Sequence, residues 1–239
     1  MSVLSIVQAA MARTNKPRPS TVVGNQDPLV AHFLALLEEL GQETVLRMPG
    51  GRLKANKSGW TAPGTQVLGT FDSLFGDAEA RLIDRTFYDL STKLMIAPWQ
   101  SDGTARSAAV IGVNPGIYNW ERIGANLVTF PAIPVGTPLT VDYYTTNWVA
   151  PVAGVPRSII VSDSDIPLLP EQMLIVGLRA KWLAEKGLAY AEQQRSFEMM
   201  LLSYQATLNT PRPLNLNQGA PLEEARPRVV VPQGPWSLP

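Results

Sequence analysis

The stretch that decides the fold is YNWERIGANLVTFPAIPVGTPLTVDYYTTNW, residues 118–148. It is rich in β-branched and aromatic residues, which are typical of strands, and glycine and proline interrupt it. Three strands are predicted, at 118–123, 126–130 and 139–148. Gly124-Ala125 predicts a tight hairpin turn between the first two. The loop 131–138 then joins the second strand to the third, so we expect an antiparallel meander of three or more strands.

Two helices are predicted on the N-terminal side of this region. Ser2 can cap a helix over 3–13, in which Val3, Ile6, Val7 and Ala10 fall on one face. Asp27-Pro28 predicts the start of a second helix, because aspartate is a favoured cap and proline a favoured first helical residue. This helix should run to about Met48, where Pro49-Gly50-Gly51 ends it.

Two more helices are predicted after the strands, at 170–186 and 188–207. Gly187 between them suits the left-handed conformation that ends many helices. The connection is so short that the two helices should form an antiparallel hairpin. Two structures remain possible for residues 71–100. DAEARLIDRTFYDL could form a helix, or a short helix could run into a strand.

These elements predict an α+β fold. We expect helices from 1–50 and 163–208 to pack as one helical bundle, from which an inserted antiparallel β region, 51–162, projects. Residues 209–239 should follow as an extended arm. Seven of them are proline, which cannot donate to a helix or a sheet ladder.

The arm nevertheless carries apolar residues that suit an interface. Val229, Val230 and Val231 suit the addition of an edge strand to another subunit, and Trp236 and Leu238 suit a pocket. We expect these five residues to dock on a neighbouring subunit.

The composition limits the classes of function that we expect. The chain has 20 basic and 20 acidic residues, so it has no net charge to favour tight binding of nucleic acid. It has no cysteine for disulfides or thiolate chemistry, and one histidine. The start lacks a secretory signal, and no apolar stretch approaches a membrane span. A soluble protein made in the cytoplasm is expected.

Catalytic, cofactor and metal sites are not predicted. His32 lies on a predicted helix without a flanking acid or serine motif, and is best explained as a surface or packing residue. Ser162-Asp163-Ser164-Asp165 resembles part of a calcium loop, but lacks its glycine and distal glutamate. A turn and cap before the helix at 170–186 is the simpler explanation. We therefore expect no enzyme.

Aromatic residues in the β region leave one alternative open. Tyr118 and Trp120 would share one face of a strand, and Tyr144 and Trp148 would share another. With Phe130 and Tyr143, they could line a stacking surface for carbohydrate or bases. A sheet core or a subunit interface is the competing explanation.

The order of these segments resembles phage head-to-tail adaptor proteins, similar to the tail accessory factors of short-tailed phages. The likeness begins with SVLSIVQAAMARTNKPRPSTVVGNQDPLVAHFLALLEELGQE and continues through YNWERIGANLVTFPAIPVGTPLTVDYYTTNWV. It ends with DSDIPLLPEQMLIVGLRAKWLAEKGLAYAEQQRSFEMMLLSYQATL, and so spans most of residues 2–208. The segment 50–115 matches loosely.

The resemblance implies a structural virion protein of the neck, between head and tail. It implies a ring, usually of twelve copies, that binds beneath the portal protein, extends the DNA channel and carries tail or nozzle proteins. DNA would pass through the lumen without tight or sequence-specific binding. The alternatives are an aromatic-lined binding module, an enzyme that uses acids of the β region, and another head-closure or tail protein.

Overall fold

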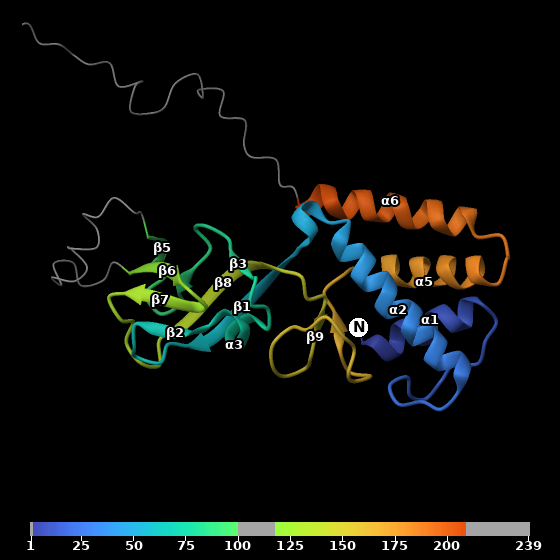
Figure 1. The fold of residues 1–239 in the computed structure, drawn as a ribbon, viewed down its shortest axis with the longest axis horizontal. Coiled ribbons are helices and arrows are strands. Elements are labelled where there is room, and N and C mark those ends of the chain that lie inside the picture. The colour runs from blue at the N-terminus through green and yellow to red at the C-terminus, as the bar shows by residue number, and fades with distance from the viewer. Residues whose placement is uncertain (1, 100–117, 209–239) are drawn as a thin grey trace, which may run out of the picture.

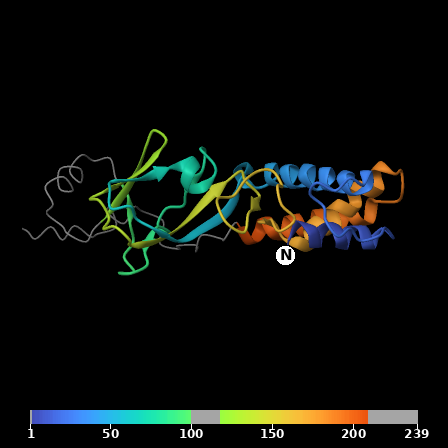
Figure 2. The ribbon, with the colours of Figure 1, turned by 90° about the horizontal axis from the view of Figure 1, so that it is seen from below.

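The structure, a computed structural model, describes residues 2–99 and 118–208. The described residues form five α-helices and several mainly antiparallel sheets, so the predicted α+β class is confirmed. The molecule is elongated, with helices at one end and most strands at the other (Figures 1 and 2). The arm and its five interface residues lie outside the described residues.

The two N-terminal helices begin where the sequence predicts. Helix α1 spans Val3–Arg13, and the Ser2 side chain accepts a hydrogen bond from the Ser5 N–H in its first turn. Helix α2 spans Pro28–Leu46, and the Asp27 carboxylate accepts from the Leu29 N–H. Each cap satisfies a backbone donor that has no partner inside the helix.

The two C-terminal helices form the predicted hairpin. Helix α5 spans Glu171–Glu185, and α6 spans Ala191–Leu208, which begins three residues later than predicted. Gly187 has a φ of +65°, a conformation that glycine adopts without steric cost. The Leu188 N–H donates to the Leu183 carbonyl and closes the end of α5.

Helices from both ends of the chain share one apolar cluster, called here the helical core. Helix α5 lies against α1, α2 and α6. The helical core includes Val3, Ile6, Val7, Phe33, Leu37, Trp148, Leu174, Leu178, Phe197 and Leu201. Burial of each large side chain contributes about 1.5–3 kcal/mol. Association of the two ends of the chain is therefore the main source of stability for these helices.

The strands form two larger sheets and one small ladder. The first sheet contains β1 (Leu53–Thr61), β8 (Pro138–Thr145), β3 (Arg81–Leu82) and β4 (Tyr88–Asp89). The second contains β2 (Val67–Thr70), β7 (Asn126–Phe130), β6 (Asn119–Ile123) and β5 (Ala97–Pro98). The ladder pairs β9 (Val149–Ala150) with β10 (Ile166–Pro167). Short helices η1 (Pro49–Gly51) and α3 (Phe71–Phe75) flank the sheets.

The predicted meander is half correct. Strands β6 and β7 form an antiparallel hairpin around Gly124, whose φ is +61°. Strand β8, however, pairs with β1, β3 and β4 rather than with β7. The reason lies in the loop 131–138, where Ile133 is fully buried. The loop therefore crosses the β core and delivers the next strand to the other sheet.

The β region has its own apolar cluster, called here the β core. Its fully or largely buried members include Leu68, Phe71, Phe75, Phe87, Ile96, Leu127, Ile133, Leu139, Val141 and Tyr143. Segment 71–100 supplies much of this core with a five-residue helix and two-residue strands, so the alternative of a single helix is wrong. Leu168 packs against both the β core and the helical core and links them.

Of the two predicted aromatic faces one is correct, since Tyr118 and Trp120 both pack against the β core. The other is not. Strand β8 ends at Thr145, and Trp148 beyond it is fully buried in the helical core. Tyr144 is exposed, and Tyr143 beside it is buried in the β core. The shared face of Tyr144 and Trp148 is therefore wrong, because the strand ends before the alternation could reach Trp148.

Candidate functional site

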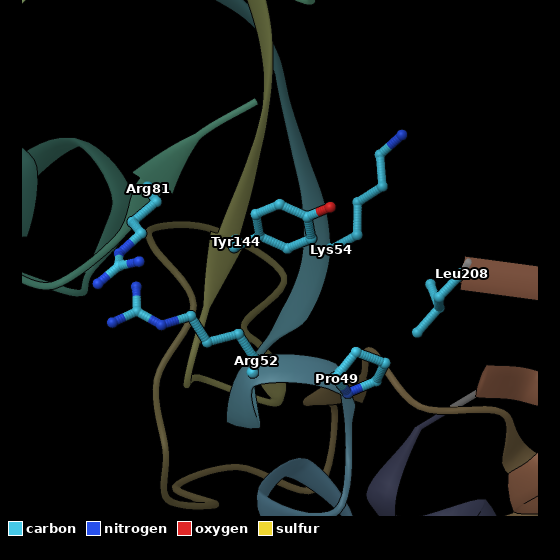
Figure 3. Close-up of a pocket in the computed structure, with 7 residues that line it drawn as sticks. Pro49, Arg52, Lys54, Arg81, Tyr144 and Leu208 are labelled. Atoms are coloured by element: carbon cyan, nitrogen blue, oxygen red, sulfur yellow. The ribbon is translucent and has the colours of Figure 1, made fainter. Parts of the chain in front are cut away.

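A pocket of about 300 Å³ opens where the helical core meets the β region. Five elements contribute to it: η1, the start of β1, strands β3 and β8, and the last residue of α6 (Figure 3). Its lining residues are Pro49, Gly50, Arg52, Lys54, Arg81, Tyr144 and Leu208. Three of the seven are cations, so the pocket, called here the cation pocket, favours an anionic ligand.

Strand register brings the charged residues together. Tyr144 lies in the central strand β8, with Lys54 of β1 directly opposite on one side and Arg81 of β3 on the other. Directly opposite residues of antiparallel strands have Cβ atoms about 4.5–5.5 Å apart. Leu53 and Ala55, on either side of Lys54, are buried. The alternation of β1 thus turns Lys54 outward.

Lys54 is neutralised within the structure. Its Nζ lies 2.8 Å from an Asp142 carboxylate oxygen. The Asn56 amide donates to the same carboxylate at 2.7 Å. Burial alone would raise the pKa of Asp142, but the hydrogen bonds from Lys54 and Asn56 hold that pKa below its ordinary value. This ion pair leaves the two arginines as the uncompensated charges of the pocket.

Arg52 and Arg81 have no carboxylate partner among the described residues. Arg52 donates to the Glu79 main-chain carbonyl, which is neutral. Figure 3 shows the two guanidinium groups pointing toward one another on one side of the pocket, away from the Lys54 ammonium. Two like charges held close together repel, and an anion between them would remove this repulsion. Arginine pairs of this kind suit carboxylate or phosphate.

A second pocket, of about 320 Å³, borders the other face of β1 and includes Lys57 and Tyr143. Burial lowers the pKa of Lys57, whose Nζ donates to the Leu74 carbonyl and lies 5.8 Å from the ring centroids of Trp60 and Phe75. Burial, with a smaller effect of Asp77, raises the pKa of Tyr143 to about 12. A phenol with that pKa stays protonated near neutral pH, and the Leu74 carbonyl holds the Lys57 Nζ.

His32 lies on α2, with Nε2 2.5 Å from a carboxylate oxygen of Glu185 on α5. Both side chains are more than a third exposed. The pair therefore joins two helices at the surface, as expected of a surface or packing histidine.

The acidic segment Ser162–Asp165 has a structural role that differs from the predicted cap. Asp163 accepts hydrogen bonds from the Val22 and Val23 N–H groups, and Asp165 accepts from Arg157 at 2.7 Å. Helix α5 begins at Glu171, and no side chain caps its start, where Pro170 is the N-cap residue. The predicted turn is present, since the Asp165 N–H donates to the Ser162 carbonyl. The predicted cap on the helix is wrong, because these carboxylates hold other loops instead.

The same segment also receives the start of α1. The Val3 N–H donates to the Asp165 carbonyl at 2.8 Å, and the Leu4 N–H donates to the Asp163 carbonyl. Within residues 2–99 and 118–208, no group of three or more acidic or histidine side chains could hold a metal ion. The carboxylates of this segment are engaged by the protein itself.

No model of a known protein family matches the chain, and no curated protein is similar to it. None of the described helices is both long and apolar enough to cross a membrane. The evidence for a function therefore consists of the residues and their geometry.

The cation pocket was not predicted from the sequence. The alternation Arg52-Leu53-Lys54 after a helix stop is a weak signal for one charged strand face. Arg81 and Tyr144 are far from it in sequence, and their pairing through β8 could not be predicted once a meander was expected.

Proposed function

We propose that this protein is a head-to-tail adaptor of a phage virion, which forms a ring beneath the portal protein, extends the DNA channel and carries tail proteins. The observation that carries the proposal is the helical core. Residues from both ends of the chain pack together there, while the middle of the chain builds a separate β core. This is the order of segments that the resemblance to such adaptors implies.

We infer that the four long helices act as one bundle and form the body of each subunit in the ring. The β region then projects from this body. Figures 1 and 2 show the four long helices at one end of the molecule and most strands at the other. A projecting domain suits contact with the portal or with tail components. The ring size, usually twelve in the proteins that the sequence resembles, is part of the same proposal.

Exposed apolar residues support contacts between subunits. On α6, the side chains of Met199 and Leu202 are 61% and 64% exposed. Near β9, Val152 and Ile159 are 74% and 53% exposed. In Figure 1, α6 runs along the top of the helical end, and the segment around β9 lies below the left end of α6, next to the β region. A ring built from one kind of subunit needs two different faces that match, and these two surfaces meet that need.

The charge balance suits a DNA channel. The chain has 20 basic and 20 acidic residues. Strong phosphate contacts would slow the passage of DNA, so a balanced chain suits a lumen that DNA only traverses. We place the protein in the neck of the virion, as a structural component without catalytic activity.

The alternative of an aromatic-lined binding module has little support. Of its candidate residues, Tyr143 and Trp148 are buried in the two cores, and Trp120 and Phe130 are half-buried. Tyr144 is the exposed member, and it lines a cationic pocket rather than an aromatic surface. Another head-closure or tail role is the closest alternative.

The proposal is tested by mixing the purified chain with portal assemblies, followed by mass measurement and imaging of the complexes. We expect a ring attached to the portal. Leu202→Lys should weaken ring formation, because it places charge in a subunit contact. Ala184→Lys, exposed on α5, is the matched control and should assemble normally. If the chain does not bind portal assemblies but an oligosaccharide alone raises its Tm, the protein is a binding module instead.

A further inference from the structure

We propose that the cation pocket binds carboxylates of the chain's own C-terminal segment, namely Glu223 and Glu224. The proposal goes beyond the adaptor role and does not depend on it. The pocket would fix the base of the arm at a defined place on the subunit and leave the residues after Glu224 to reach a partner.

Two of the pocket's three cations are open to an anionic ligand. Of its three cations, Lys54 is paired with Asp142. Arg52 and Arg81 face one another, and no described carboxylate lies within ion-pair distance of either. Arginine binds a carboxylate through two parallel N–H donors, and two arginines can hold two adjacent carboxylates. The ligand chemistry expected here is a pair of neighbouring carboxylates.

The chain itself supplies such a pair. Leu208, the last described residue of α6, lines the pocket, so the segment 209–239 leaves from its rim. Glu223 and Glu224 are the two acidic residues of that segment. The arginines of the segment, at 212, 226 and 228, are repelled by the pocket. The glutamate pair therefore provides the attractive side-chain charge of the segment.

The tether makes this encounter favourable. Fourteen residues lie between Leu208 and Glu223, and a chain of that length reaches at most roughly 50 Å, so the two glutamates can return to the pocket that Leu208 lines. A ligand on a tether of this length has an effective concentration in the millimolar range. A free anion in solution must exceed that concentration to displace it. For this reason we favour the chain's own carboxylates over phosphate groups of DNA.

Disulfide trapping tests the proposal in the full-length chain, which contains no natural cysteine. The test pair combines Ala225→Cys, next to the glutamates, with Glu79→Cys, at an exposed residue whose carbonyl accepts from Arg52. The control pair combines Ala225→Cys with Leu46→Cys. Leu46 is 76% exposed at the end of α2 and lies outside the pocket. Leu46 is nevertheless close to the end of α6, because the Gln205 side-chain amide of α6 donates to the carbonyl of Arg47, which follows Leu46 in the chain.

We expect the disulfide between positions 79 and 225 to form within one chain, at least fivefold faster than the control disulfide. Replacing both glutamates by glutamine, or Arg52 and Arg81 by glutamine, should reduce the rate to that of the control. Exchanging the charges, with Arg52→Glu and Arg81→Glu combined with Glu223→Arg and Glu224→Arg, should restore it. An arginine variant that fails to fold is recognised by its circular dichroism spectrum, and the trapping rate of the glutamate variants then provides the test.

Three outcomes would overturn the proposal. The first is a trapping rate that does not change when the charges are removed. The second is a disulfide that forms between two chains, since the pocket would then hold a neighbour's segment. The third is that replacing Arg52 and Arg81 by glutamine abolishes binding of a DNA oligonucleotide but leaves the trapping rate unchanged. The pocket would then be a phosphate site.

Discussion

Gly41 lies inside α2, where glycine is normally unfavourable, and the structure explains its presence. A Cβ atom at this position would lie 2.4 Å from the Cε2 atom of Trp148. The indole ring of Trp148 is fully buried in the helical core, and its Nε1 donates to the Ser158 carbonyl at 2.9 Å. Trp148 also follows β8 directly, so it attaches the β region to the helices. We predict that Gly41→Ala disrupts this attachment.

Two opposing effects set the size of the change. Alanine is favoured over glycine inside a helix by about 1 kcal/mol. Overpacking a core costs about 1–3 kcal/mol, and the upper part of that range applies here because a rigid, fully buried ring must move. We expect a net loss of about 1–2 kcal/mol in the free energy of unfolding. For a chain of this size, that loss lowers Tm by about 2–8 °C.

Thermal unfolding followed by circular dichroism measures the change. Gln42→Ala, the exposed neighbour in α2, is the control and should leave Tm nearly unchanged. In a Trp148→Leu background the indole atoms nearest to the new methyl group are gone, so adding Gly41→Ala should be neutral or stabilising. A coupling of at least about 1 kcal/mol between the two substitutions is expected. If Gly41→Ala raises the Tm of the wild-type protein, helix propensity outweighs the overlap and the reasoning is refuted.

Asp165, His32 and the C-terminal arm each offer a further test. Burial would raise the pKa of Asp165, but hydrogen bonds from Val161, Arg157 and Ser162 hold it below its ordinary value; Asp165 therefore stabilises the fold above about pH 4 and loses this effect as the pH falls further. Urea unfolding should accordingly show Asp165→Asn well below wild type at pH 7, with a difference that shrinks toward pH 3. Replacing His32 by Gln should leave virion infectivity close to normal, and a collapse of infectivity with an intact fold would reveal a site we have missed. Deleting residues 209–239 should leave Tm nearly unchanged but weaken ring attachment, and Trp236→Ala should have a milder effect of the same kind; normal assembly by the truncated chain would mean that the arm is passive.

Local signals predicted the helices well because their causes are local. Ser2 and the pair Asp27-Pro28 set the starts of α1 and α2 through hydrogen bonds within one turn and a fixed proline φ. The apolar stripe of α1 also predicted which residues are buried. Gly187 marked the end of α5 for the same local reason.

The order of strands in the sheets was harder to predict from the sequence, because strand pairing depends on the path of the connecting loops. Residues 131–138 have the proline and glycine content of a turn, which predicted that β8 would return beside β7. Burial of Ile133 within the β core favours a crossing to the other sheet instead. Segment 71–100 was equally ambiguous, since its two-residue strands are too short to show an alternation.

The cation pocket follows from the same misprediction. In the predicted meander, Tyr144 would have had β7 residues as neighbours, and its exposure would have suggested an aromatic surface. With β8 placed between β1 and β3, its neighbours become Lys54 and Arg81. The chemistry of this site is thus decided by strand order, and no motif of adjacent residues carries it. A charged site assembled from three strands and the end of α6 also depends on both cores being intact. Its anion affinity should therefore report on the attachment of the β region to the helices, and Gly41→Ala should weaken it without touching any residue of the pocket.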